Sequence, residues 1–315
     1  MPRPYLDDMH WSVSPESRTG TARPATVLAL LGGVVDYAGL FPPAGLPMAA
    51  AVAEYLAARS GPDAWMLGRF VLPVLRLSEF AAESAPADRA EVVRLSAIVR
   101  DGADEDRMAV TVFNRDSARH RAVVDTIESK PQALEGIDRL ADRFGSEFDV
   151  YVEVAAGDDA GRWLERVCDR GLKAKLRTGG LTADAFPSAS SLITFIDQAV
   201  RLDVAFKATA GLHHAVRGTY RLTYETGSAV APMYGYLNLL LAAAGRRAGL
   251  PLLDCERLLQ LTDAAGLDFG ERFVRWGSVE LPVEALRAVR DHTLVSFGSC
   301  SFTEPVGELH ALTVS

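Results

Sequence analysis

The chain has 315 residues, of which 49% are hydrophobic and 23% are charged, and its formal net charge is −8. This composition is typical of an ordinary globular protein, and the acidic balance argues against a general nucleic-acid-binding protein, which usually carries a basic patch. The three cysteines, Cys168, Cys255 and Cys300, lie far apart, so the sequence favours neither a disulfide framework nor a zinc ribbon, and it is typical of a reducing cytoplasm.

Residues 1–24 are polar, and we expect an irregular arm there, not a secretory signal. From residue 26 onward, strand-like and helix-like segments alternate. Strands are predicted over 26–36, 65–74, 108–114, 148–156, 171–180, 204–210, 272–276 and 294–302. Helices are predicted over 48–60, over two pieces broken near Ser84 to Pro86, and over 116–129, 131–144, 158–169, 188–201, 233–249, 251–266 and 282–292.

About eight strands separated by helices predict parallel pairing with crossover helices. The fold class is therefore α/β, and eight such units predict a (β/α)8 barrel of the TIM type, with residues 25–315 as a single catalytic domain. The alternative is an open doubly wound sheet, but no Gly-x-Gly-x-x-Gly motif opens a helix. The most apolar stretch, 236–244, is too short to cross a bilayer, so we expect a cytoplasmic protein that makes no membrane contact.

Three consecutive predicted strands have one aliphatic face and one charged face. Because side chains alternate along a strand, Glu153, Lys175, Arg177, Lys207 and Thr209 all lie opposite the aliphatic residues. Charges cannot stay unpaired in a dry core, but they can lie at the wet mouth of a barrel, where the active sites of such enzymes are found. We expect these residues to form a functional site, and the alternative is a structural ion cluster.

Other strand ends add candidates. Asp36 closes the first predicted strand and Arg69 lies inside the second, where its alternative role is that of a structural partner for Asp36 or Glu153. Substrate-binding groups are expected at Arg177, Arg69, Thr209, Thr178, Gly179, Gly180 and Ser299. Cys300 has no assigned histidine partner, so we expect a packed thiol and not a nucleophile.

The first chemistry that these residues allow is imine catalysis. A lysine ammonium that is crowded by other cations and partly desolvated has a lowered pKa and attacks carbonyl groups. Lys175 would crowd Lys207 in this way, and Glu153 or Asp36 would move protons. On this hypothesis we expect Lys207→Ala to fold normally and to be inactive.

The segment FKATAG, on the sixth predicted strand, resembles the Schiff-base strand of class I aldolases with a (β/α)8 barrel, above all the deoxyribose-phosphate aldolase type. The resemblance implies that Lys207 forms the imine, that Lys175 lowers its pKa and that Glu153 acts as acid and base. It also implies a lyase that needs no cofactor.

Two other chemistries stay open. Lys175, Arg177 and Lys207 could bind a phosphate or carboxylate, with the Thr-Gly-Gly turn offering backbone N–H groups, and a non-catalytic anion-binding barrel would use the same charges. His213 and His214 follow the strand of Lys207 and could relay protons, or could bind zinc or manganese together with Glu153.

The sequence therefore predicts a lyase that acts on a small anionic carbonyl compound, phosphorylated or carboxylated. The catalytic candidates are Lys207, Glu153, Lys175, Asp36, His213 and His214. The broadly apolar helix at 233–249 packs in the core or at a subunit interface, and we expect a homodimer.

Overall fold

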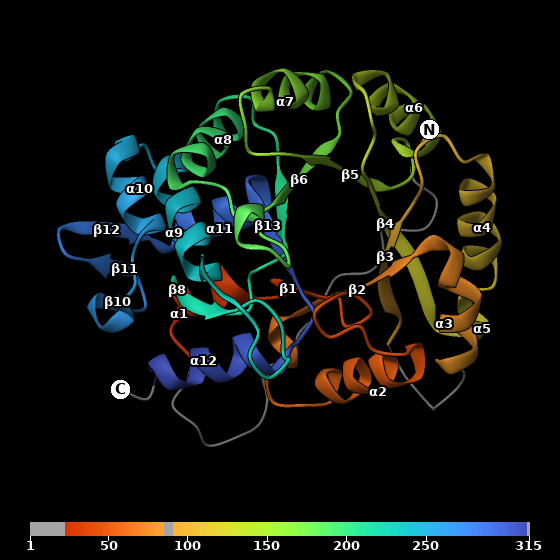
Figure 1. Cartoon of the computed structure of the whole chain (residues 1–315), viewed down its shortest axis with the longest axis horizontal. Helices are drawn as coiled ribbons and strands as arrows, with labels where there is room; N and C mark the ends of the chain where they lie inside the picture. Colours follow the sequence, from red (N-terminus) through yellow and green to blue (C-terminus); the bar gives the residue numbers. More distant parts are fainter. Residues whose placement is uncertain (1–22, 85–90, 314–315) are drawn as a thin grey trace.

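The computed structural model describes residues 23–84 and 91–313, so nearly all of the arm predicted over residues 1–24 lies outside the described residues. Eight parallel strands close into a barrel in the order β1-β13-β7-β6-β5-β4-β3-β2. Helices surround this ring (Figure 1). The predicted (β/α)8 barrel is therefore confirmed. The barrel strands are β1 Val35–Tyr37, β2 Leu67–Pro73, β3 Val93–Ile98, β4 Ala122–Ser129, β5 Asp149–Val154, β6 Lys173–Arg177, β7 Phe206–Thr209 and β13 Leu294–Ser299.

The helices connect these strands and bury their apolar faces against them. They are α1 Ala25–Leu31, α2 Met48–Arg59, α3 Leu77–Glu83, α4 Asp104–Arg115, α5 Ser117–His120, α6 Leu134–Phe144, α7 Ala160–Asp169, α8 Ala189–Arg201, α9 Tyr236–Arg247, α10 Leu252–Leu259, α11 Val283–His292 and α12 Thr303–Thr313. Aliphatic residues of the strands, such as Val152, Leu176 and Ala208, are fully buried in one continuous core. The predicted aliphatic faces of the central strands therefore pack as expected.

Several predicted elements are wrong. Residues 26–31 form α1 and not the start of a strand, and residues 108–114 belong to α4. The helix predicted over 116–129 contains β4, and β3 lies within a piece that the sequence predicts as helical. Residues 272–276 do contain a strand, but it belongs to a sheet outside the barrel. Lys207 consequently lies on the seventh barrel strand in chain order, and not on the sixth.

Among the described residues, two small sheets are not part of the barrel. An antiparallel sheet, β10 Leu267–Phe269, β11 Phe273–Trp276 and β12 Val279–Pro282, lies outside the ring beside α9 and α10 (Figure 1). A hairpin, β8 Gly218–Arg221 and β9 Val230–Met233, forms part of the long connection from β7 to α9. The loop at the tip of this hairpin contributes to the site described below.

The apolar composition of helix α9 is explained by its packing within a single chain. Every residue from Tyr236 to Gly245 is buried, because the helix packs against α8, α10 and α11. Packing in the core of one chain therefore accounts for the apolar helix that suggests a homodimer. The homodimer stays a prediction. Within residues 23–84 and 91–313, no helix has both the length and the apolar character needed to cross a membrane.

Candidate active site at the barrel mouth

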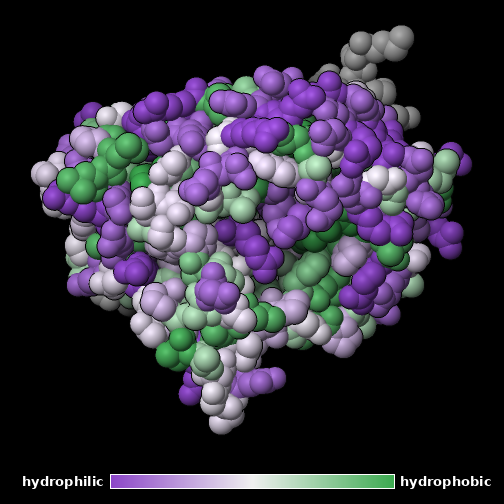
Figure 2. Space-filling view, turned by 45° about the horizontal axis from the view of Figure 1, so that its top comes forward, coloured by the Kyte–Doolittle hydropathy of each residue, from purple (hydrophilic) through white to green (hydrophobic). Residues whose placement is uncertain are grey.

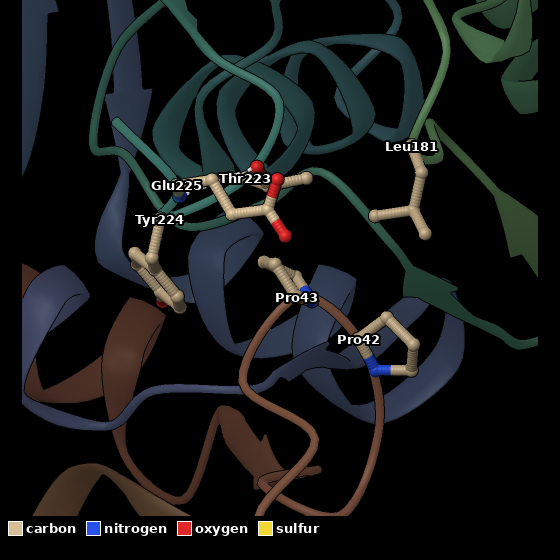
Figure 3. Close-up of a pocket in the computed structure, with 6 residues that line it drawn as sticks. All are labelled: Pro42, Pro43, Leu181, Thr223, Tyr224 and Glu225. Carbon is tan, nitrogen blue, oxygen red and sulfur yellow. Dashed lines mark hydrogen bonds between the residues drawn. The ribbon is translucent and has the colours of Figure 1, made fainter. Parts of the chain in front are cut away.

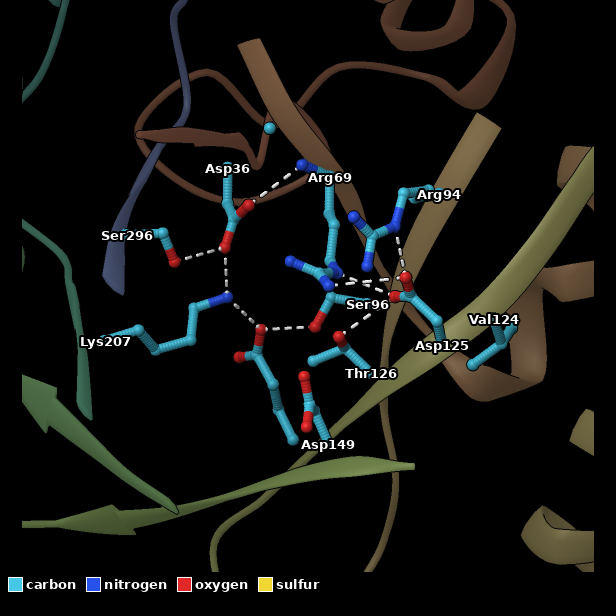
Figure 4. A network of polar contacts seen from close by, with 12 residues as sticks. Asp36, Arg69, Arg94, Ser96, Val124, Asp125, Thr126, Asp149, Lys207 and Ser296 are labelled. Carbon is cyan, nitrogen blue, oxygen red and sulfur yellow. Dashed lines mark hydrogen bonds and ion pairs between the residues drawn. The ribbon is translucent and has the colours of Figure 1, made fainter. Parts of the chain in front are cut away.

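Lys207 lies at the centre of a buried cluster of charges (Figure 4). Its side chain is 2% exposed, and its Nζ donates hydrogen bonds of 2.6 Å to both Asp36 Oδ2 and Glu128 Oε1. The Ser296 hydroxyl donates to the same Asp36 oxygen at 2.8 Å, and the Ser96 hydroxyl donates to Glu128 Oε1 at 2.6 Å. These bonds join strands β1, β3, β4, β7 and β13 across the interior of the barrel.

Glu128 extends the cluster toward β5 and β6. Its Oε2 lies 3.0 Å from Lys175 Nζ, and Lys175 Nζ lies 3.3 Å from Glu153 Oε2. Glu153 in turn pairs with Lys130 at 3.1 Å. The charges thus alternate in sign from Asp36 through Lys207, Glu128, Lys175 and Glu153 to Lys130. We call this set the buried charge network.

Arg69 extends this polar interior on the β2 side. Its backbone N–H donates to Asp36 Oδ1 at 2.8 Å, and its guanidinium donates to Asp125 Oδ1 at 2.7 Å. Arg94 also pairs with Asp125 (Figure 4). Because its guanidinium pairs with a buried carboxylate, Arg69 fits its structural alternative better than the expected role in substrate binding. The partner of the guanidinium is Asp125, and neither Asp36 nor Glu153.

The surroundings of Lys207 overturn the expectation of a lowered pKa. Burial alone would lower it, but the adjacent carboxylates of Asp36 and Glu128 raise the pKa of Lys207 above its ordinary value. Burial likewise disfavours the charged form of Glu128, and the ammonium groups of Lys207 and Lys175 outweigh that effect, so the pKa of Glu128 lies well below its usual range. Lys175 is the register neighbour of Lys207 on β6, but Glu128 pairs with both ammonium groups and so offsets the repulsion between them.

The turn after β6 is shaped by packing. The Thr178 hydroxyl donates to the carbonyl of Ala210 at 2.6 Å and so ties the ends of β6 and β7 together. A Cβ on Gly179 would lie 2.5 Å from the Phe186 ring, and one on Gly180 would lie 2.7 Å from Ala185 Cβ. These contacts explain both glycines without a ligand.

Arg177 is the exception in this region. It is the last residue of β6 and is exposed, and within the part of the chain that the structure describes its guanidinium has no ion pair or hydrogen bond. Its register partner on β7 is Thr209, which faces Gly298 of β13. Of the three cations predicted to bind an anion, Lys175 and Lys207 already pair with carboxylates, and Arg177 alone is available.

The sequence assigns no histidine partner to Cys300, but in the structure His213 lies beside it. Its Nδ1 and Nε2 lie 3.8 and 3.9 Å from Cys300 Sγ, and its Nδ1 lies 3.4 Å from Glu304 Oε2. The Tyr224 hydroxyl donates to Glu304 Oε2 at 3.0 Å and lies 3.6 Å from the Cys300 sulfur. Ser299 Oγ is 3.3 Å from His213 Nδ1 but donates to the carbonyl of Ser301, so it is a local partner of the histidine.

His214 points to a different partner. Its Nδ1 lies 2.5 Å from Glu308 Oε1, and its ring stacks on Tyr220 with 3.4 Å between centroids. Glu153 belongs to the buried charge network, where it pairs with lysines. His213, His214 and Glu153, the residues of the alternative metal site, therefore have different partners, and among the described residues no group of three or more His, Cys, Asp or Glu could hold a metal ion.

Tyr224, which contacts Cys300 and Glu304, also lines a pocket of about 390 Å³. The pocket lies between the loop after β1, the loop after β6 and the tip of the β8–β9 hairpin (Figure 3), and its lining residues are Pro42, Pro43, Leu181, Thr223, Tyr224 and Glu225. Its volume falls within the range of small-molecule sites. Figure 2 shows a face covered mostly by hydrophilic residues, with hydrophobic ones in separate small groups.

Sequence reasoning misses Glu128, Asp125 and Glu304. The first two lie on β4, within a segment that the sequence predicts as a helix. The pairing of His213 with Cys300 spans 87 positions. The pairing could have been predicted from the positions of the two residues after predicted strands. Strands β7 and β13 pair in parallel, so the loops that follow them lie at the same end of the barrel. Comparison with protein-family models and with curated protein sequences finds no match to this chain.

Proposed function

We propose that this chain is an enzyme that acts on a small anionic carbonyl compound bound at the mouth of the barrel, with Arg177 binding the anion. The observation that carries the proposal is the exposed guanidinium at the carboxyl end of β6, which pairs with none of the described residues. In barrels of this fold, active sites lie at the carboxyl ends of the strands. A planar guanidinium binds carboxylate and phosphate groups through paired hydrogen bonds.

The imine role that the aldolase resemblance implies for Lys207 stays a prediction. Two observations favour an electrostatic role instead: the side chain is 2% exposed, and its ammonium pairs with two carboxylates. An imine requires the neutral amine, and these carboxylates favour the charged form. We therefore propose that Lys207 holds Asp36 and Glu128 in place beneath the site. Lyase chemistry and a cytoplasmic location also stay predictions.

Substitution of Arg177 tests the proposed binding site. We expect purified protein to bind members of a panel of 2-oxo acids, phosphorylated aldehydes and carboxylated esters in isothermal titration calorimetry. Arg177→Ala should weaken that binding by about 10-fold or more, because a hydrogen bond to a charged group contributes about 1.5–3 kcal/mol.

Arg221 provides the matched control. It is an exposed arginine of β8 that pairs with no described residue, and Arg221→Ala should bind the panel like the wild type. Equal binding by Arg177→Ala and the wild type, or no binding of any panel member to the wild type, would contradict the proposal.

A further inference from the structure

We propose that Cys300 is a covalent nucleophile, that His213 exchanges its proton, and that Glu304 is a positioning residue for His213. The proposal deepens the proposed function, on which it rests for the class of substrate. Its basis is geometric: the thiol lies within 3.9 Å of both ring nitrogens of a histidine whose Nδ1 lies 3.4 Å from a carboxylate. A thiol, an adjacent base and a group that orients the base form the arrangement of an activated nucleophile.

The fold places these groups together at the correct end of the barrel. Cys300 immediately follows β13, and His213 lies in the loop after β7, the neighbouring parallel strand. Glu304 lies in the first turn of α12, and its backbone N–H donates to the Ser301 hydroxyl at 3.2 Å. Helix α12 therefore begins three residues after the thiol, and the amino end of a helix favours a nearby negative charge.

The electrostatics favour the charged form of His213. Burial lowers the pKa of His213, but Cys300 and Glu304 outweigh that effect and raise the pKa to about 9. The titratable groups that face its ring are Cys300, Glu304 and, through its contacts with both, the Tyr224 hydroxyl. His214, the next residue, is held by Glu308. A cationic imidazole beside a thiol stabilises the thiolate, which is the reactive form.

Access to the thiol is through Tyr224. Its side chain lines the 390 Å³ pocket, and its hydroxyl lies 3.6 Å from Cys300 Sγ. Cys300 itself is 5% exposed, so a substrate in the pocket reaches the sulfur when the Tyr224 ring moves aside. Cys168 and Cys255 are also free thiols, one exposed and one buried, and neither has a histidine partner among the described residues.

The chemical step is addition to the carbonyl group. The thiolate sulfur forms a bond to the carbonyl carbon, and the electron pair of the carbon–oxygen π bond moves to the oxygen. The His213 imidazolium gives its proton to that oxygen and becomes neutral. The product is a covalent hemithioacetal on Cys300, and the step needs no oxidant, reductant or second substrate.

Alkylation by iodoacetamide tests the nucleophile without the natural substrate. In this reaction the sulfur–carbon bond forms and iodide leaves. We would measure the rate at each cysteine by peptide mass spectrometry from pH 5.5 to 9.5, with the exposed Cys168 as the internal reference. At pH 6.5 an ordinary thiol is only about 1% ionised. We expect Cys300 to react at least about 10-fold faster than in the His213→Gln variant, since the thiolate fraction outweighs its lower intrinsic reactivity.

Three further variants complete the experiment. Glu304→Gln should move the pH profile of Cys300 toward that of Cys168, which a merely structural role would not do. Tyr224→Ala should accelerate labelling of Cys300, because it removes the covering ring. His120→Gln, on α5 with its ring stacked on Phe113, should leave the rate at Cys300 unchanged.

The proposal is overturned if Cys300 reacts at pH 6.5 no faster than in His213→Gln, both in the otherwise unchanged protein and in the Tyr224→Ala background. Iodoacetamide is uncharged and does not need Arg177. A failure here therefore leaves anion binding untouched, and a failure of the Arg177 experiment leaves this result interpretable.

Discussion

At the residue scale, Lys207 shows what a sequence pattern can and cannot predict. The alternation in VAFKAT correctly places its side chain opposite the aliphatic face, inside the barrel. The pattern does not reveal its partners, because Asp36 and Glu128 are 171 and 79 positions away in sequence. The lysine that the sequence predicts as an imine former is therefore an ammonium group paired with two carboxylates in the structure.

Lys207→Met should destabilise the protein strongly. The substitution leaves the buried carboxylates of Asp36 and Glu128 without the cation that compensates both, and breaking such a pair costs about 3–5 kcal/mol. The free energy of unfolding in urea measures the effect. This expectation corrects the sequence-based one, in which Lys207→Ala folds normally.

Lys130 offers the control for this measurement. Its side chain is 67% exposed and pairs with Glu153 at the outer end of the buried charge network, so Lys130→Met should cost less than about 1 kcal/mol. A Lys207→Met protein that is as stable as Lys130→Met would show that the network does not stabilise the fold.

At the element scale, the sequence predicts the number of barrel units correctly but misassigns some of them. Met108, Val110 and Val112 alternate as in a strand, yet they lie in α4, which buries Val110 and Phe113 and leaves Met108 and Val112 exposed. Three acidic residues in the first turn and Arg115 in the last turn stabilise this helix through its dipole. Periodicity over so few residues cannot distinguish the two structures, and only the tertiary packing decides.

Gly235 is the position where one element depends on close approach to another. It precedes α9, and a Cβ there would lie 2.2 Å from the carbonyl oxygen of Ala215, in the loop that carries His213 and His214. Gly235→Ala should therefore force this loop and α9 apart and cost about 1–3 kcal/mol. Thermal unfolding would measure the loss, and Gly157→Ala, where no atom lies within 4 Å of the added Cβ, should be nearly neutral. Equal melting temperatures for the two variants would contradict the packing argument.

At the scale of the whole molecule, the barrel joins an aliphatic outer layer to a charged interior. The fold class and the inward charges can be predicted from the sequence, since both depend on local alternation. The chain of ion pairs from Asp36 to Lys130 and the contact of His213 with Cys300 cannot, because they depend on which strands become neighbours when the barrel closes.

The buried charge network also predicts how stability depends on pH. The folded-state pKa values of Glu128 and Glu153 lie below their ordinary values, so their contribution is complete above the unfolded pKa of about 4.3 and is lost as pH falls through the folded values. The pKa of Lys207 is raised, so its contribution is complete below about 10.4 and is lost as pH rises through the folded value. The network should therefore stabilise the fold fully between about pH 5 and 9.

Glu128→Gln isolates this contribution. Urea unfolding of the wild type and the variant should give a difference in free energy that is constant from about pH 5 to 9 and shrinks below about pH 5, where the unfolded wild-type chain begins to protonate Glu128 while the folded protein does not. The comparison is needed because the pKa of His213, raised to about 9, makes the stability of both proteins fall as pH rises from about 6.5 through 9. Since His213 is present in both, its effect cancels in the difference. A difference that grows below pH 5 would mean that Glu128 is already protonated in the folded protein, and Lys207 would then have only Asp36 to balance its charge.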